Sequence, residues 1–120
     1  MRVKIGERDL EFGQELGELR DCNTLLNDMK ALHARLAEDG YLLVRGLHPR
    51  DKVFAARGAI LEFMRANGDA VLHGTDLMEG VINPAGRPVR LMGNPAITHD
   101  PRVLAVLEGA PLHVFFEQFF

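Results

Sequence analysis

Five histidines are the residues of this 120-residue chain best suited to metal chemistry. A facial non-heme iron site needs His-x-Asp or His-x-Glu on one strand, with a second histidine far away in the sequence. No histidine here has a carboxylate two positions later; the histidines are His33, His48, His73, His99 and His113. Zinc is disfavoured too, because the chain has one cysteine and no paired histidines. The sequence therefore predicts no metal ligand in this chain.

Two groups of polar residues come closest to a site. His73, Asp76 and Glu79 in HGTDLME could meet at one ion if they lie on a loop, but we expect them to form a solvated polar stretch. The adjacent carboxylates Glu38 and Asp39 fall at a predicted helix end, where we expect them to be solvated. Neither group indicates a catalytic pair.

Nucleophilic catalysis has little support. The chain contains no serine, which excludes a serine nucleophile, and no glycine-rich phosphate loop precedes a helix. Cys22 lies in RDCNT without a histidine base, as expected for an ordinary surface or partly buried cysteine. Arg90 and Met92, on a predicted strand after a turn, are the best candidates to line a substrate pocket.

Composition indicates one globular domain spanning residues 1–120, in which residues 1–24 form a hairpin and loop lead-in. The chain is 47% hydrophobic and 26% charged, with a net charge of −3. Its basic residues are scattered, so we expect no nucleic-acid partner. No apolar run reaches the length of a membrane span, which favours a soluble, cytoplasmic protein without a membrane partner.

The first half of the chain predicts a hairpin, a helix and a strand. VKIGERDLEF alternates apolar residues around a polar turn, which is typical of a β-hairpin. A helical stripe follows, with Asn27 or Asp28 as its cap and Gly40 as its end. The stripe consists of Leu25, Met29, Leu32 and Leu36. YLLVRGL (41–47) then reads as a largely buried strand.

The second half predicts more helix. Residues 48–68 form a helix with Pro49 in its first turn and Asn67-Gly68 at its end; its stripe is Val53, Ile60, Leu61 and Met64. Gly58 in its middle is either required by packing or simply tolerated, and the second interpretation is simpler. VINPAGRPVRLM predicts a second hairpin around residues 83–86. Asp100-Pro101 begins a short helix that ends near Gly109.

Pro111 begins a last helix with an aromatic face. Leu112, Phe115, Phe116 and Phe119 recur at helical spacing. A ten-residue helix is too short to be stable alone in water, so this face must pack against something. We expect Phe115, Phe116 and Phe119 to form a packing or interface surface, because the rest of the chain predicts no large sheet for them to cover.

Two passages resemble a known family. LHARLAEDGYLLVRGLHPRDKVFAARGAILEFM is similar to the N-terminal segment of the phytanoyl-CoA dioxygenase family, in its order of helix, acidic-Gly-aromatic step, strand, Arg-Gly turn and helix. LMEGVINPAGRPVRLMGNPAITHDPRVLAVLEGAPLHVFFEQFF resembles the connecting region of bacterial members, in which a Phe-rich helix leads into the catalytic β-fold. The resemblance covers nearly the whole chain from about Leu25.

The resemblance implies an α+β fold: a helical N-terminal flank with a few short strands, packed on a double-stranded β-helix, or jelly roll. It also implies an oxidoreductase, an Fe(II)- and 2-oxoglutarate-dependent dioxygenase that hydroxylates a small organic substrate. Its iron ligands and its 2-oxoglutarate-binding basic residue would follow the Phe-rich helix. On this expectation the 120 residues are a truncated N-terminal part that binds neither iron nor 2-oxoglutarate and is inactive alone.

A second hypothesis is a complete helical interaction module. Its Phe115/Phe116/Phe119 face would then dimerise or capture a partner protein. The partner surface of those phenylalanines is therefore either the jelly roll or another protein.

Overall fold

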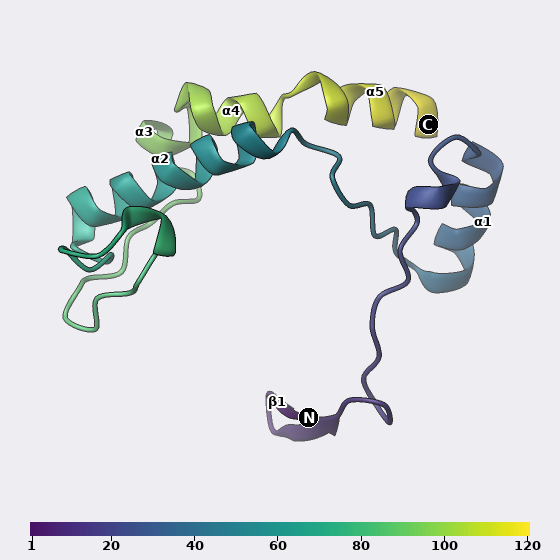
Figure 1. Cartoon of the computed structure of the whole chain (residues 1–120), viewed down its shortest axis with the longest axis horizontal. Coiled ribbons are helices and arrows are strands. Elements are labelled where there is room, and N and C mark those ends of the chain that lie inside the picture. Colours follow the sequence, from purple (N-terminus) through teal and green to yellow (C-terminus); the bar gives the residue numbers. More distant parts are fainter. The chain divides into compact units, whose positions relative to one another are not determined.

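A computed structural model describes residues 1–120 (Figure 1). The chain consists of two compact units, Met1–Arg45 and Gly46–Phe120. The chain is a mixed α+β protein, as expected. Its helices and strands are β1 (Arg2–Ile5), β2 (Arg8–Glu11), η1 (Asn23–Leu25), α1 (Met29–Asp39), α2 (Arg50–Gly68), η2 (Leu77–Glu79), α3 (Pro95–Thr98), α4 (Pro101–Leu107) and α5 (Ala110–Phe119).

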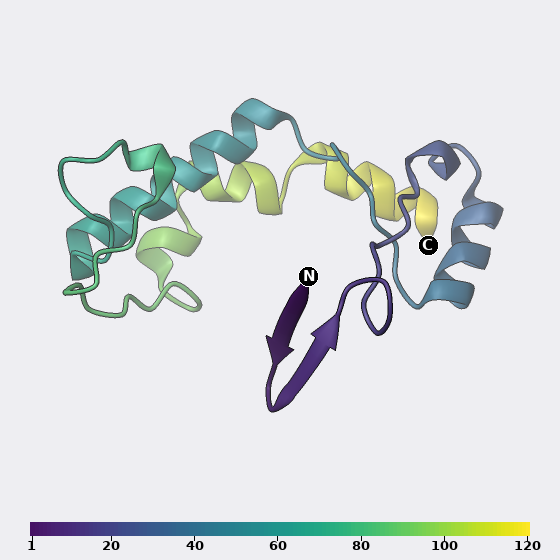
Figure 2. The ribbon, with the colours of Figure 1, turned by 60° about the horizontal axis from the view of Figure 1, so that its bottom comes forward.

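The first unit begins with the predicted β-hairpin. Strands β1 and β2 pair antiparallel, with Val3 opposite Leu10 and Ile5 opposite Arg8 (Figure 2). Gly6 occupies the first position of the two-residue loop with a φ of 60°. A positive φ at this position is the requirement of a type II′ turn, which glycine meets without strain.

Helix α1 forms as its caps predict. The Asp28 side chain accepts a hydrogen bond from the Ala31 amide (3.0 Å), so Asp28 is the N-cap. Gly40 ends the helix in the left-handed conformation (φ 75°) and donates its amide to Leu36. Leu32, from the predicted stripe, is fully buried, whereas Leu25 belongs to the preceding 3-10 helix.

The predicted strand over residues 41–47 is wrong as an independent element. Leu43 makes one isolated parallel bridge, to Asp21, and accepts the Cys22 amide at 2.9 Å. The Asn23 side chain pairs with the backbone of Arg45 in both directions, at 2.7 and 2.8 Å. A strand in a sheet pairs with a neighbouring strand. Here residues 41–47 pair only with the irregular segment around Cys22 and with the Asn23 side chain.

Helix α2 begins and ends slightly differently from the prediction. Pro49 is its N-cap and does not lie in the first turn. The left-handed residue that ends the helix is Asp69 (φ 53°), one position after Gly68. Gly68 is needed for a close approach, because a Cβ there would lie 2.6 Å from the Arg87 carbonyl oxygen. Gly58 is buried, yet its Cβ would meet only Met78 Sδ at an ordinary 3.7 Å, which supports the interpretation that this glycine is tolerated.

The predicted second hairpin does not form. Its turn exists, since the Gly86 amide donates to the Asn83 carbonyl at 3.0 Å. The chain after the turn returns to the end of α2, where the Arg87 amide donates to the Gly68 carbonyl at 2.7 Å. Ile82 is bridged instead to Val71. Hydrogen bonds to α2 and to residue 71 have replaced the cross-turn pairing.

Two short helices precede α5. Helix α4 begins with Asp100 as N-cap and Pro101 at its first position, as predicted. Helix α3 was not predicted, although Asn94-Pro95 gives the same capping signal. Gly109 precedes the first residue of α5 and is its N-cap.

The core of the second unit lies where α4 runs along α2, as both views show (Figures 1 and 2). Small side chains on α2 let the two helices approach, and the buried cluster is Ala56, Ala59, Ile97 and Val103. Arg102 at the start of α4 reinforces the contact through ion pairs to Glu62 on α2 and to Asp100, both at 2.9 Å.

Acid should loosen the start of α4. The hydrogen bond from the Arg102 guanidinium, with that from the Arg102 amide, lowers the pKa of Asp100 below its ordinary value of 3.8. A carboxyl group whose pKa is lower in the folded chain than in the unfolded chain stabilises the fold. This stabilisation is complete when the pH is above the pKa of the unfolded chain, and it is lost as the pH falls through the pKa of the folded chain. We expect the unfolding free energy of Asp100→Asn, which keeps a capping side chain, to fall less than that of the unchanged protein below about pH 4. Urea titrations between neutral and acidic pH would measure this; equal losses in both proteins would contradict it.

Candidate functional site: the apolar surface of the second unit

Helix α2 exposes apolar side chains beside the α2/α4 core. Val53, which the sequence placed in the buried stripe, is exposed, and Phe54 is 45% exposed. The Arg50 guanidinium lies over the Phe54 ring at 5.2 Å and covers one of its faces. This exposed aromatic ring was not predicted, because Phe54 lies outside the apolar stripe and has charged residues nearby.

A shallow apolar groove of about 370 Å³ adjoins these residues. Its walls come from α2 and α4, and the lining residues are Val53, Ala56, Arg57, Ile60, Leu61 and Val106. Arg57 is already engaged, donating to the Met78 carbonyl at 3.0 Å and so holding η2 against α2. The groove therefore offers apolar contact and no free charged group, which suits a packing surface better than the orientation of a reactive substrate.

The phenylalanines of α5 form two stacked rows. Phe115 stacks on Phe119 and Phe116 stacks on Phe120, each pair at 5.8 Å between ring centres. Phe119 is buried and Phe115 is half-buried, whereas Phe116 is 43% and Phe120 93% exposed. The predicted face of Phe115, Phe116 and Phe119 is thus divided, and the outward row is Phe116 with Phe120.

Both units expose large hydrophobic side chains. Those of the first unit include Ile5, Phe12 and Leu19, and those of the second include Ile82, Met92 and Leu107.

The pocket candidates lie on the irregular segment before α3, where Met92 is in a turn and the predicted strand is absent. The Arg90 Nε donates to the Met92 carbonyl at 3.1 Å, and the Met92 side chain is 83% exposed. Neither residue lines the α2/α4 groove. The structure places both at the surface, and their role as pocket residues stays a prediction.

The possible cluster of His73, Asp76 and Glu79 does not assemble. The His73 Nε2 pairs with Asp69 Oδ1 at 2.9 Å, and Asp76 accepts the Met78 amide at 2.8 Å as the cap of η2. No group of three or more histidine, cysteine or acidic side chains in the chain has the geometry to hold a metal ion. Capping of η2 accounts for Asp76, and the pair with Asp69 accounts for His73.

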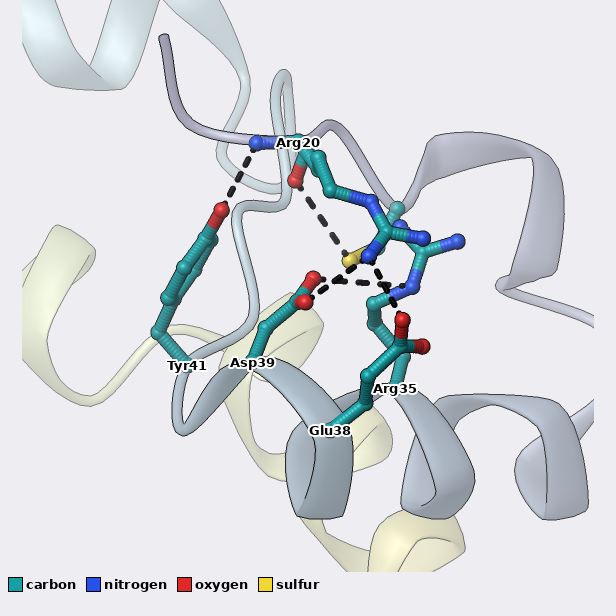
Figure 3. A network of polar contacts seen from close by, with 6 residues as sticks. Arg20, Arg35, Glu38, Asp39 and Tyr41 are labelled. Carbon is teal, nitrogen blue, oxygen red and sulfur yellow. Dashed lines mark hydrogen bonds and ion pairs between the residues drawn. The ribbon is translucent and has the colours of Figure 1, made fainter. Parts of the chain in front are cut away.

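A polar network in the first unit was missed by the sequence analysis (Figure 3). The Arg20 guanidinium donates to Glu38 at 3.0 Å and to Asp39 at 2.9 Å, while the Arg20 amide donates to the Tyr41 hydroxyl at 2.8 Å. Arg35 approaches the second oxygen of Asp39 at 3.6 Å. The hydrogen bond from Arg20 lowers the pKa of Glu38.

This network corrects the expectation that Glu38 and Asp39 are simply solvated. The Asp39 side chain is only 11% exposed because two arginines cover it. Cys22, beside Arg20 in the sequence, is fully buried, and its Sγ faces the Arg20 carbonyl at 3.9 Å. Every charged group of the network has a partner from the chain itself, so its role is to attach residues 20–22 to the end of α1.

Comparisons with known proteins give no relative. No protein-family model, curated protein or solved structure matches the chain. None of the helices combines the length and apolar character that crossing a membrane requires.

Proposed function

We propose that this chain is the N-terminal helical flank of a non-heme Fe(II)- and 2-oxoglutarate-dependent dioxygenase of the phytanoyl-CoA dioxygenase type. In the whole enzyme it would pack on a jelly roll that hydroxylates a small organic substrate. The observation that carries the proposal is the uncovered apolar surface of α2 and α5, including Phe54, Phe116 and Phe120.

The local structure of the resembling passage supports the proposal. Helix α1 ends at Gly40, an extended segment follows, Gly46 turns the chain with a φ of 69°, and α2 begins at Arg50. The two helices and the glycine turns follow the order that the resemblance implies, whereas the strand that it implies between them is reduced to one bridge at Leu43.

The cofactors do not fit residues of this chain. Iron of the facial type needs two histidines and a carboxylate in one place, and the chain has no such group. We therefore assign the iron and 2-oxoglutarate ligands to the jelly roll and derive no catalytic step from these 120 residues. Arg90 and Met92 are proposed to border the substrate entrance of the whole enzyme.

Cofactor binding by the native gene product tests this proposal. Equilibrium dialysis should show Fe(II)-dependent binding of 2-oxoglutarate to the protein purified from its source, and none to the 120-residue chain. Tight, stoichiometric uptake of Fe(II) by the 120-residue chain would show that the ligands have been assigned to the wrong part of the protein.

A second candidate is an interaction module that uses the outward aromatic row of α5. The strong exposure of Phe116 and Phe120 favours it, because soluble proteins rarely leave neighbouring aromatic rings in water. A self-sufficient module should unfold cooperatively, whereas a part without its jelly roll should aggregate or bind hydrophobic dyes.

Substituting Phe116 and Phe120 tests whether this outward row is an interface. We expect Phe116→Ser with Phe120→Ser to reduce dye binding and self-association, because these changes remove exposed apolar area without touching the buried Phe119. Dye fluorescence and sedimentation velocity provide the measurements. Gln118→Ser, an exposed polar position on the same helix, is the matched control and should change neither. Unchanged association in the double variant would exclude this row as an interface.

A further inference from the structure

The segment Tyr41–Arg45 has a bonded edge and an open edge. Leu43 accepts the Cys22 amide, and both backbone groups of Arg45 bond to the Asn23 side chain. These bonded residues are two positions apart, which is the period of an extended strand. Gly40 and Gly46, both with positive φ, bound the segment.

The open edge belongs to Leu42 and Val44. In an extended strand their N–H and C=O groups point away from the Cys22–Asn23 side. Neither residue makes a backbone or side-chain hydrogen bond in the chain, although their side chains are half-buried. YLLV also lacks the lysine, proline or bulge with which proteins usually protect a sheet edge.

We propose that this edge pairs with the same segment of a second copy of the chain, antiparallel about a two-fold axis at Leu43. Such a pairing places Leu42 opposite Val44 of the second copy. Both residues have their backbone groups on the open side, so each pair exchanges two N–H···O=C bonds. The two-fold axis produces the pair twice, and every open group of the edge is then bonded.

Charge favours this register and a second copy. The antiparallel pairing sets Arg45 opposite Tyr41 of the second copy, whereas an in-register parallel pairing would set the two Arg45 side chains side by side. Arg45 is also paired with Asp21, Nε to Oδ2 at 3.2 Å, so the edge brings no net charge to the interface. A two-fold contact of this kind is the commonest way in which identical chains associate. The inference is independent of the proposed function.

Amide exchange followed by NMR tests the pairing in the unaltered chain. Where nine-tenths of the chains are paired, the Leu42 and Val44 amides should exchange about tenfold more slowly than in dilute solution, because a bonded amide exchanges only when the pair opens. The Arg45 amide, already bonded to Asn23, is the internal control and should not change with concentration. If the chain sediments as a monomer at all concentrations up to about 1 mM, the dissociation constant of the dimer would exceed that of typical specific contacts. That result would overturn the proposal. So would a dimer in which both amides keep their dilute exchange rates.

Charge-exchanged variants test the register. One chain carries Leu42→Lys and Val44→Lys, and another carries Leu42→Glu and Val44→Glu. Each alone should be monomeric, because like charges face each other across the two-fold axis, and their mixture should form a heterodimer. If both variants fold but the mixture stays monomeric while the unaltered chain is dimeric, the register is wrong. If the variants fail to fold, the exchange measurement on the unaltered chain decides.

Discussion

Gly68→Ala is expected to destabilise the second unit by about 1–3 kcal/mol, the usual cost of overfilling a tightly packed position. The new Cβ would lie 2.6 Å from the Arg87 carbonyl oxygen and would also collide with a methyl group of Val89. The backbone of Arg87 cannot move away freely, because its amide is bonded to the Gly68 carbonyl. Urea unfolding followed by far-ultraviolet circular dichroism would measure the loss.

Gly58→Ala is the matched control in the same helix. Gly58 is also buried, but its Cβ has ordinary room beside Met78. We expect a gain of about 0.5–1 kcal/mol, because alanine is the better residue inside a helix. If the two variants lose similar amounts, the close approach of residues 87–89 to the end of α2 is wrong.

Leu32→Ala is expected to unfold the first unit or to cost it about 2–5 kcal/mol, as for other buried leucines. Leu32 and Cys22 are the only fully or nearly fully buried hydrophobic residues of Met1–Arg45, so no other core residue can compensate. Without Leu32, helix α1 loses the packing that an 11-residue helix needs in water.

Tyr41 gives a local readout of this change. It is the chain's single tyrosine, there is no tryptophan, and its hydroxyl accepts the Arg20 amide in the first unit. Tyrosine fluorescence should therefore follow the first unit during urea unfolding. Leu19→Ala, at an exposed position of the same unit, should change stability by no more than about 0.5 kcal/mol. Equal effects of the two substitutions would show that Leu32 is not the core of this unit.

Local capping signals predicted the helices well. Asp100 caps α4 and Gly40 ends α1, as predicted, and of the two predicted caps of α1, Asn27 and Asp28, it is Asp28 that accepts the amide hydrogen bond. Such signals act within a few residues, so they can be read without knowledge of the tertiary structure. Helix α3 carried the same signal at Asn94 and could have been found.

Elements that depend on distant partners were predicted poorly. YLLVRGL has the composition of a strand, but a strand also requires a partner, and in this chain Leu43 has one bridge. The turn at Asn83–Gly86 was predicted correctly, while the hairpin was not, because residue 87 bonds to α2 instead. The local sequence shows neither the missing partner of residues 41–47 nor the bond from residue 87 to α2, because both depend on residues far away in the chain.

The candidate site was predicted in part. Helical spacing placed Phe115, Phe116 and Phe119 near one another, but spacing alone could not show that Phe119 is buried and Phe116 exposed. The exposed ring of Phe54 lies outside the apolar stripe, so helical spacing could not point to it. Arg20 and Asp39 are far apart in the sequence, so their ion pair had no local signal.

The intact mass of the native gene product, purified from its source, tests the central claim most directly. The proposed function predicts a mass well above the 13.4 kDa of these 120 residues, with a His-x-Asp pair and a later histidine in the additional sequence. A mass equal to that of the 120 residues would contradict it and would make the outward row of Phe116 and Phe120 the leading candidate for the protein's function.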